Sequence, residues 1–415
     1  MARRDRRIRG DHLLPVHGLN AASENLGAGK TPANRRAGDA GAQSCEPALR
    51  IAGVDPERGF AGGETQVMGL TAELLRGGHR AELICDPAGE LWRRAQAAGI
   101  RCHPLRVRNS IDAVAGFRLR GILGANCFDV AHFHTARAHA LAPFARGTAR
   151  ALIVTRRMDY PPNRIFARWL FNRAVDGVAA ISPAVADALE SAGVPRAGIA
   201  IIPSGVDCER LRPPTVTERR AARIRFALGE GDVALGAIGA LEPRKGHRGL
   251  IDAIARLREM EPLRCLIAGG GGERVELAAQ IERLGLARRV RLIGPIEDAR
   301  ELLWALDIFA MPSLKEGLGV AALEAMACGL PVVASRTGGL ADLIEDDVTG
   351  ALAAPGDAGA LADAIAALAA APMRRMEIGS AALARVRSDY TMTAMARRTL
   401  ALYRECIRRR ESRGE

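Results

Sequence analysis

Residues 311–339 read MPSLKEGLGVAALEAMACGLPVVASRTGG. The pattern predicts a buried strand over 307–312, a glycine-bearing turn, a helix over 319–327 and a second short strand over 331–335. A strand, a helix and a strand in this order form the βαβ unit of a parallel sheet. This stretch therefore predicts an α/β fold with a parallel sheet.

Two carboxylates belong to this unit. Glu316 falls in the turn before the helix, whose first N–H groups have no partner within the helix. Glu324 stands alone among alanine, leucine and methionine, so we expect it to point into a cleft. A carboxylate beside free N–H groups suits a ligand with an anion and hydroxyls, such as a nucleotide sugar. The plainer interpretation is that the macrodipole and solvation favour both acids near a helix start.

The same alternation of short apolar runs and helical stretches continues along the chain. A first run of strands is predicted at 49–54, 80–85, 100–105, 129–133, 151–155, 177–181 and 199–202, and a second at 233–239, 263–268, 289–293, 307–312, 331–335 and 350–353. Two runs of this kind predict two doubly wound α/β units that face a cleft.

Three further segments complete the predicted organisation. Residues 1–47 are polar, basic and without periodicity, which predicts a disordered extension. The loosely patterned residues 206–230 are predicted to be a linker. Helical sequence over 357–410, broken near Pro372 and at 389–391, closes the chain.

Composition narrows the classes of function. The chain has 415 residues and a net charge of +12, carried almost wholly by arginine, but only 4% aromatic residues and no nucleic-acid-binding module. We therefore expect no nucleic acid partner. No apolar run reaches the length of a membrane span and no signal-peptide core follows Met1, which favours a cytoplasmic protein. The eight cysteines are scattered and the histidines lack partners at ligand spacing, so no metal site is predicted.

Other strand ends carry weaker signals. Arg244 and Lys245 follow the strand 233–239 and Gly239, where they suit a diphosphate or a merely solvated basic turn. Gly62-Gly63 opens the first helix, a place where phosphate or acceptor can approach. His134 follows the strand 129–133. It can either contact a ligand or form a hydrogen bond within its own loop, and the sequence does not distinguish these two interpretations. For His132 and His139 the structural interpretation is favoured.

These pieces, in this order, resemble the retaining glycosyltransferases of family 4 (glycosyl transferases group 1). They are Gly62-Gly63-Glu64, His132-Phe133-His134, Ile202-Pro203-Ser204-Gly205-Val206-Asp207, Arg244-Lys245-Gly246, the segment from Glu316 to Glu324, and Gly338-Gly339. The resemblance covers about Leu49 to Tyr403. It implies the GT-B fold, with two Rossmann-like domains and C-terminal helices that cross back to the first. The implied domains are an N-terminal extension (1–47), an acceptor-binding domain (48–212), a donor-binding domain (213–388) and a returning helix (389–415).

The resemblance also implies roles for individual residues. Arg244 and Lys245 would hold the donor diphosphate, Glu316 the transferred sugar, and Glu324 the ribose. The N–H groups of Gly319 and Val320 would add to phosphate binding, and Gly294 and Ile296 would border the base. His134 would contact the donor sugar. The implied catalytic residues are Glu316, His134, Lys245 and Arg244, and the implied donor-binding residues are Gly62, Gly63, Gly239, Arg244, Lys245, Gly294, Ile296, Glu316, Gly319, Val320 and Glu324.

The implied activity is metal-independent transfer, with retention of configuration, from a UDP- or GDP-sugar to a glycan or lipid-linked acceptor. No cofactor beyond this co-substrate is implied. The many arginines between Arg101 and Arg173 suit an anionic membrane surface, which favours a role in lipopolysaccharide, capsule or other surface-polysaccharide synthesis at the cytoplasmic face of the inner membrane. A sugar phosphorylase or nucleotide-sugar epimerase of the same fold, and a non-catalytic nucleotide-sugar-binding protein, remain alternatives.

Overall fold

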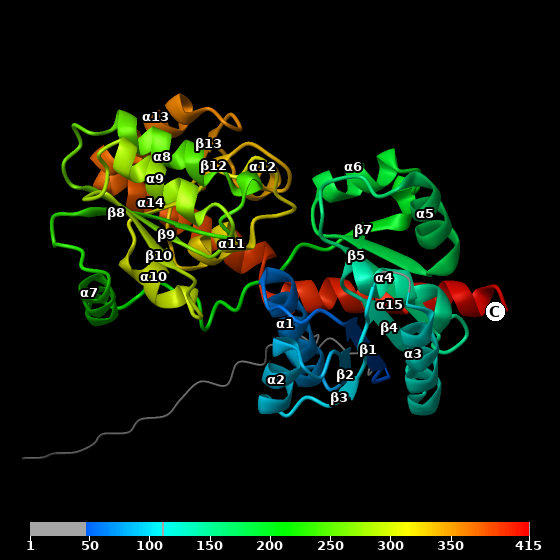
Figure 1. The fold of residues 1–415 in the computed structure, drawn as a ribbon. Helices are drawn as coiled ribbons and strands as arrows, with labels where there is room; N and C mark the ends of the chain where they lie inside the picture. Colours follow the sequence, from blue (N-terminus) through cyan, green and yellow to red (C-terminus); the bar gives the residue numbers. More distant parts are fainter. Residues whose placement is uncertain (1–46, 110–111, 415) are drawn as a thin grey trace, which may run out of the picture. The chain divides into compact units, whose positions relative to one another are not determined.

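The computed structural model describes residues 47–109 and 112–414 (Figure 1). The prediction of disorder for residues 1–47 therefore falls, apart from Pro47, outside the described residues. The chain from Pro47 onward makes up one compact unit that contains two parallel sheets. Both sheets were predicted from the spacing of apolar runs.

The first sheet has seven parallel strands in the order β3-β2-β1-β4-β5-β6-β7. Its strands are β1 (Arg50–Asp55), β2 (Arg80–Cys85), β3 (Cys102–Pro104), β4 (Val130–Phe133), β5 (Ala151–Arg156), β6 (Gly177–Ala180) and β7 (Ile199–Ile201). The strand order reverses between β1 and β4. These two strands are neighbours in the sheet, and Ile51 of β1 lies opposite Val130 of β4. The loops after β1 and β4 therefore diverge at this point and leave room for a ligand at the carboxyl edge.

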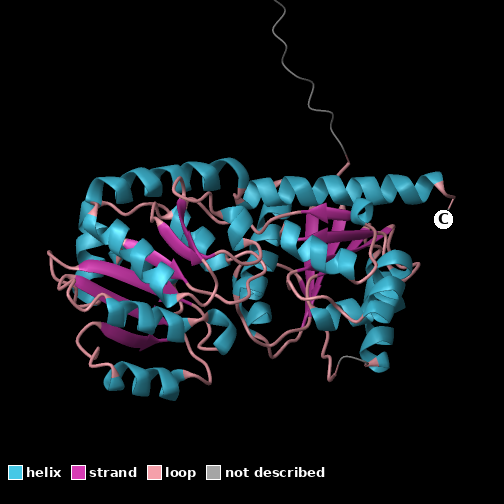
Figure 2. Ribbon diagram, turned by 90° about the horizontal axis from the view of Figure 1, so that it is seen from above, coloured by secondary structure: helices cyan, strands magenta, loops and turns pink. Residues whose placement is uncertain are grey.

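Helices connect these strands. They are α1 (Gly62–Arg76), α2 (Glu90–Ala97), α3 (Ala113–Asn126), α4 (Ala136–Leu141), α5 (Arg164–Trp169) and α6 (Pro183–Ser191), with short helical turns at Ala142–Ala145, Leu170–Ala174 and Arg196–Gly198. Seen from above, helices lie on either side of the strands (Figure 2). Each sheet face consequently packs its own set of apolar side chains, one set around Phe133 and Leu152 and the other around Ile153 and Tyr403.

The second sheet has six parallel strands in the order β10-β9-β8-β11-β12-β13. Its strands are β8 (Val233–Ile238), β9 (Leu263–Ala268), β10 (Val290–Gly294), β11 (Ile308–Met311), β12 (Val332–Ser335) and β13 (Gly350–Ala353). Its helices are α8 (His247–Arg256), α9 (Arg274–Arg283), α10 (Ala299–Ala305), α11 (Val320–Ala327), α12 (Leu340–Leu343), α13 (Ala358–Ala370) and α14 (Pro372–Asp389). Here the strand order reverses between β8 and β11. The βαβ unit predicted from residues 311–339 is confirmed as β11, α11 and β12.

The last helix, α15 (Met392–Ser412), returns to the first sheet, where it packs against α1, β5 and β6. Tyr403 is fully buried there, and its hydroxyl is 2.7 Å from Nδ1 of His132 on β4. The breaks predicted near Pro372 and at 389–391 separate α13, α14 and α15. Within residues 47–109 and 112–414, none of the helices is both long and apolar enough to cross a membrane.

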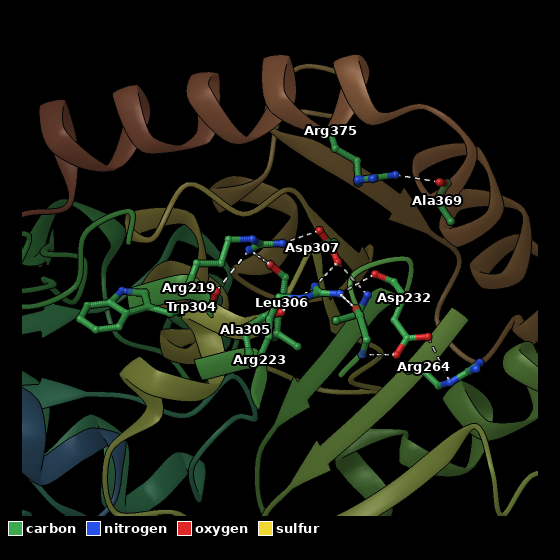
Figure 3. Close-up of polar contacts among 12 residues, drawn as sticks. Arg219, Arg223, Asp232, Arg264, Trp304, Ala305, Leu306, Asp307, Ala369 and Arg375 are labelled. Atoms are coloured by element: carbon green, nitrogen blue, oxygen red, sulfur yellow. Dashed lines mark hydrogen bonds and ion pairs between the residues drawn. The ribbon is translucent and has the colours of Figure 1, made fainter. Parts of the chain in front are cut away.

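The prediction of a loosely patterned linker over 206–230 was partly wrong, because α7 (Val216–Arg225) lies within it. Figure 3 shows how this helix is held against the second sheet. Arg219 and Arg223 donate to the two carboxylate oxygens of Asp307 at 2.6 and 3.1 Å. The carboxylate also accepts from the backbone N–H of Ala234 at 2.8 Å. Only Ala222 of α7 is buried, so apolar packing contributes little to its position. The charge network around Asp307 thus holds this polar helix in place.

Candidate active site

A cavity of about 1730 Å³ lies where the loops at the reversal points of both sheets meet. From the first half it is lined by residues around Gly62, Gly63 and Ser204. The second half contributes Gly239, Arg244, Lys245, Ile296, Glu316, Gly319, Val320 and Glu324. Reversal points are where doubly wound folds bind ligands, because neighbouring loops turn to opposite faces of the sheet there. Most of the residues predicted for the donor site therefore line one cavity.

Lys245 and Glu316 form an ion pair in this cavity. Their side chains are only 13% and 12% exposed, and Ser313 Oγ is 3.2 Å from the same carboxylate oxygen of Glu316. Lys245 ends a short turn, Pro243–Lys245, after β8, and Glu316 lies in the loop after β11. The pair places one cation beside one carboxylate. The cation can bind an anionic group of a ligand, and the carboxylate can accept hydrogen bonds from hydroxyl groups of the same ligand.

Two glycines allow this approach. Gly246 has φ +68°, and a Cβ there would lie 2.0 Å from the carbonyl oxygen of Pro312. Gly338 has φ +49°, and a Cβ there would lie 1.8 Å from the carbonyl oxygen of Glu316. Larger residues would push both loops apart. Gly246 thus lets the loop that carries Lys245 approach the end of β11, and Gly338 lets the loop after β12 approach the backbone of Glu316.

The N-terminus of α11 opens into the same cavity. Gly319 precedes the helix in a left-handed conformation (φ +97°) and no side chain caps the first N–H groups. Gly62, at the start of α1, lies opposite, since a Cβ there would be 3.7 Å from the Cβ of Val320. The uncapped N-terminus of α11 therefore contributes partial positive charge to this space, which favours an anion. At the start of α1 the carboxylate of Glu64 accepts from the N–H of Ala61 at 2.7 Å and offsets the charge of that helix end.

Glu324 also lines the cavity, as expected from its isolation in an apolar helix. Burial raises the pKa of Glu324 to about 7; Arg210 acts to lower this pKa, and Asp298 acts to raise it. Arg210 and Asp298 form an ion pair at 2.9 Å and line the cavity as well. This end of the site therefore presents carboxylate oxygens, which can accept hydrogen bonds from vicinal hydroxyls.

The loop after β10 borders the cavity through Pro295 and Ile296. Gly294 lies behind it, where its φ of +80° turns the chain and its carbonyl oxygen accepts from the N–H of Gly269 at 2.8 Å. Gly294 therefore shapes the loop and does not itself line the cavity. Gly239, at the end of β8, does line it, as predicted.

His134 is not among the lining residues. It is 4% exposed, and its ring lies against that of His132, with centroids 3.9 Å apart and the two planes tilted by 41°. Burial lowers the pKa of His134 well below its usual value. His134 therefore lies outside the lining of the cavity in this structure, and its contact with the donor sugar stays a prediction. Side chains alternate along a strand, so His134 is directed to the same face as His132, the face that α15 covers.

The structural interpretation of the other two histidines is confirmed. His132 Nε2 is 2.6 Å from the hydroxyl of Thr155, and its Nδ1 faces Tyr403. His139 Nε2 donates to the carbonyl oxygen of Thr155 at 3.1 Å. Burial lowers the pKa of His132 to about 3 and that of His139 to about 4, so both rings are neutral. Their hydrogen bonds connect β4, α4 and α15 to one another through Thr155 of β5 and Tyr403.

Arg157 is a lining residue to which the sequence did not assign a role. Its NH1 lies 3.4 Å from the hydroxyl of Ser204, and within the described residues its Nε has no hydrogen-bond partner. Burial lowers the pKa of this guanidinium, whereas Asp55 and Glu64 act to raise it. A guanidinium held in this way can bind an anion that enters the cavity. The available signal was the charged group Arg156, Arg157 and Asp159 directly after a buried strand.

In the part of the chain that the structure describes, no group of three or more His, Cys, Asp or Glu side chains is arranged to hold a metal ion. The polar groups at the cavity are instead cations, helix N-termini and separate carboxylates. Such a set binds a phosphate-containing ligand through charge-assisted hydrogen bonds.

Comparison with known proteins agrees with this geometry. Residues 60–210 match the family model "Glycosyltransferase Family 4", and residues 218–385 match "Glycosyl transferases group 1". A GDP-mannose-dependent alpha-(1-6)-phosphatidylinositol monomannoside mannosyltransferase of Mycolicibacterium smegmatis is 32% identical over 71% of this chain and 81% of its own. The chain belongs to the family 4 glycosyltransferases.

Other relatives of the family are matched over less of their length. A D-inositol 3-phosphate glycosyltransferase of Xylanimonas cellulosilytica is 31% identical over 71% of this chain and 70% of its own. D-inositol 3-phosphate glycosyltransferase 2 of Catenulispora acidiphila is 36% identical, but the match spans 48% of this chain and 49% of the relative. The chain thus spans about half the length of several curated relatives that it matches.

Solved structures establish the fold of this family 4 member. The complex of Anabaena HepE with UDP and glucose has a TM-score of 0.76 at 24% identity and covers 85% of this chain and 98% of its own. A glycosyltransferase from Rickettsia africae has a TM-score of 0.78 at 20% identity, with coverage of 87% and 99%. The two parallel sheets and the returning C-terminal helix are the GT-B fold.

Proposed function

We propose that this protein transfers a glycosyl group from a nucleoside-diphosphate sugar to a hydroxyl group of an acceptor, with retention of configuration. One observation supports this most strongly. The Lys245–Glu316 pair, the uncapped N-terminus of α11 and Glu324 line a single cavity. A diphosphate requires cations and free N–H groups, and the hydroxyls of a hexose and a ribose require carboxylates that accept hydrogen bonds.

This arrangement supports the following proposed roles. Arg244, Lys245 and the N–H groups at Gly319 and Val320 hold the diphosphate and stabilise the charge that develops on it as the sugar leaves. Glu316 accepts hydrogen bonds from hydroxyls of the transferred sugar. Glu324 accepts from the ribose, and the loop at Ile296 borders the base. The relatives named above support a GDP- or UDP-linked donor, since one is GDP-mannose-dependent and another structure contains UDP with glucose.

The reaction forms one bond and breaks another at the anomeric carbon of the donor sugar. The acceptor hydroxyl oxygen forms the new bond to the anomeric carbon, on the face from which the diphosphate leaves. The bond from that carbon to the diphosphate oxygen breaks, and its electron pair stays on the oxygen. The leaving phosphate takes the proton of the acceptor hydroxyl. The products are the glycoside and a nucleoside diphosphate, with no step assigned to a protein nucleophile.

We assign the acceptor to the first half, residues 48–212, and the donor to residues 213–388, with residues 389–415 as the returning helix. Packing of α11 against α14 and of α15 against α1 supports this division. The relatives act on a phosphatidylinositol monomannoside or on D-inositol 3-phosphate by their names. A glycan or lipid-linked acceptor in surface-polysaccharide synthesis is the finer assignment that we propose.

An exposed apolar face on α5 supports docking at the anionic cytoplasmic face of a membrane. Ile165 is 83% and Trp169 49% exposed, and Phe166 is exposed beside them. Arg164 and Arg168 lie on the same short helix. Exposed apolar and aromatic side chains next to cations suit the interface of anionic lipid. Flotation with vesicles should show salt-sensitive binding that Ile165→Ser/Trp169→Ser weakens; absence of binding would refute docking.

The decisive experiment measures donor binding and turnover separately. Thermal shift with UDP-glucose and GDP-mannose should show which donor stabilises the full chain. Nucleotide release should then require an acceptor such as myo-inositol 3-phosphate or a phosphatidylinositol mannoside. Release that depends on inorganic phosphate would indicate a phosphorylase, and a change of the sugar without an acceptor would indicate an epimerase. Binding without any turnover across acceptors would indicate a non-catalytic protein.

A further inference from the structure

A second cavity of about 870 Å³ lies in the first half, at the carboxyl edge of the seven-stranded sheet. Residues 57–59 after β1, residues 106–108 and 112 after β3, and the N-terminal parts of α3 and α4 line it. Five arginines line it, together with the acidic residues Glu57 and Asp112. The arginines are Arg58, Arg106, Arg108, Arg118 and Arg137. The lining therefore carries an excess of three positive charges.

Two of the five arginines have carboxylate partners. Arg137 lies 3.3 Å from Glu57, and Arg58 lies 2.9 Å from Asp86. The other three, at positions 106, 108 and 118, form no ion pair with any residue in 47–109 or 112–414.

Asp112 does not neutralise them by contact. Its carboxylate accepts from the backbone N–H groups of Arg108 at 2.9 Å and Ala115 at 3.0 Å, and so caps α3. Three exposed arginines without an ion-pair partner among the described residues thus line one cavity. Asp112 and Asp86 attract them only through space, since these arginines act to lower the pKa of the two carboxyls. The excess of positive charge favours an anionic ligand.

This cavity adjoins the larger one. Arg58 and Gly59 line both, and the loop that contains them leads directly into Gly62 at the start of α1. A ligand anchored by the arginines can therefore extend past this loop toward Glu316, where the sugar would be transferred. Since the lining belongs wholly to the first half, the ligand that it suits is the acceptor.

We propose that the three arginines Arg106, Arg108 and Arg118 bind a phosphate group of the acceptor, remote from the hydroxyl that receives the sugar. The proposal rests on the proposed function. Guanidinium groups match phosphate because their planar N–H donors can bind two oxygens at once. Two sources carry such a phosphate, a soluble polyol phosphate and the headgroup of a phospholipid.

The test compares phosphorylated and unphosphorylated probes on the full chain. Isothermal calorimetry should detect binding of myo-inositol 3-phosphate and no comparable binding of myo-inositol. The triple variant Arg106→Gln/Arg108→Gln/Arg118→Gln should weaken binding of the phosphate-bearing probe by at least about tenfold, because the loss of one charge-assisted hydrogen bond is already worth about that much. Binding should also weaken as salt rises.

A matched triple variant controls for net charge. Arg80, Arg220 and Arg283 are exposed and line neither cavity, so Arg80→Gln/Arg220→Gln/Arg283→Gln should leave probe binding unchanged. Vesicles of phosphatidylcholine with phosphatidylinositol distinguish the lipid source. If the first triple variant loses vesicle binding but the soluble probe never binds, the phosphate is that of a lipid headgroup.

The outcomes separate this inference from the proposed function. Donor-induced thermal stabilisation should survive in the first triple variant, which also shows that it is folded. If the wild-type chain binds a nucleotide sugar but the triple variant binds both phosphate sources as tightly, the inference is refuted and the proposed function stands. If no nucleotide sugar binds the wild-type chain, the proposed function itself fails.

Discussion

Lys245 and Glu316 form an ion pair although 71 residues separate them in the sequence. Lys245 follows β8, and Glu316 follows β11. These two parallel strands are neighbours, and Leu235 of β8 lies opposite Ile308 of β11. The strand order reverses between these two strands, so the loops after them end at one edge of the sheet. This relationship places a cation beside a carboxylate in the candidate active site.

Replacement of Glu316 by alanine should reduce acceptor-dependent nucleotide release by about a hundredfold or more, because the transferred sugar loses a partner that positions it. The chain should still fold, with a lowered melting temperature, because the mostly buried Lys245 loses its carboxylate partner. Nucleotide-release kinetics and a thermal melt check this. Glu259→Ala, at an exposed position, is the control. Unchanged turnover in Glu316→Ala would exclude the role assigned to it.

Lys245→Ala should weaken binding of the nucleotide sugar by roughly ten- to a hundredfold, the value of a charge-assisted hydrogen bond to phosphate. Calorimetry with the donor measures this. Lys315→Ala is the matched control, because Lys315 is exposed and does not line the cavity. Equal affinities for the two variants would contradict a diphosphate contact by Lys245.

Donor affinity should rise with pH between about 6 and 8 because of Glu324. Burial raises the pKa of this carboxyl from 4.5 to about 7, and only the ionised form accepts hydrogen bonds from both ribose hydroxyls. The free energy of unfolding should change with pH in the opposite direction. The raised pKa means that the folded chain binds the proton more tightly, so this group costs stability as pH rises from 4.5 to about 7.

The measurement is a pH series of UDP-sugar or GDP-sugar binding, since their diphosphates do not titrate in this range. Glu324→Gln cannot ionise and should flatten the dependence. An identical pH slope in Glu324→Gln and the wild-type chain would show that another group is responsible.

Alanine at Gly246 should both destabilise the fold and weaken donor binding. The residue has φ +68°, and the added Cβ would lie 2.0 Å from the Pro312 carbonyl oxygen, so the loop that carries Lys245 has to move. Gly249, on the adjoining helix α8, has open space and an ordinary φ. Gly249→Ala should instead stabilise by about 0.5–1 kcal/mol. Urea unfolding of both variants checks the contrast, and equal effects would contradict it.

Asp307→Asn should lower the free energy of unfolding by about 2 kcal/mol, because hydrogen bonds to a charged group are the stronger ones. The carboxylate holds Arg219 and Arg223 of α7 and the N–H of Ala234 (Figure 3). Equilibrium urea denaturation measures the loss. Asp363→Asn on the exposed face of α13 serves as the control, and a loss no larger than that of the control would mean that the network contributes little.

The apolar periodicity was sufficient to predict the strands, the helix over 319–327 and the helical segment that closes the chain. Each predicted strand appears within one or two residues of its expected bounds, because buried parallel strands need continuous apolar runs. Helix α7 was missed for the converse reason, since it buries only Ala222. Its capping box, Thr215 with Glu218, was the signal that could have revealed it.

The sequence by itself determined the two α/β sheets, the glycine-rich turns at strand ends and the isolation of Glu324 in an apolar helix. These are local properties that follow from side-chain periodicity and backbone freedom. Only the tertiary structure decided that Lys245 reaches Glu316, that Arg157 lines the cavity and that His134 does not. Such outcomes depend on the order of strands in a sheet and on which face a side chain takes, and both are set by contacts between residues far apart in the chain.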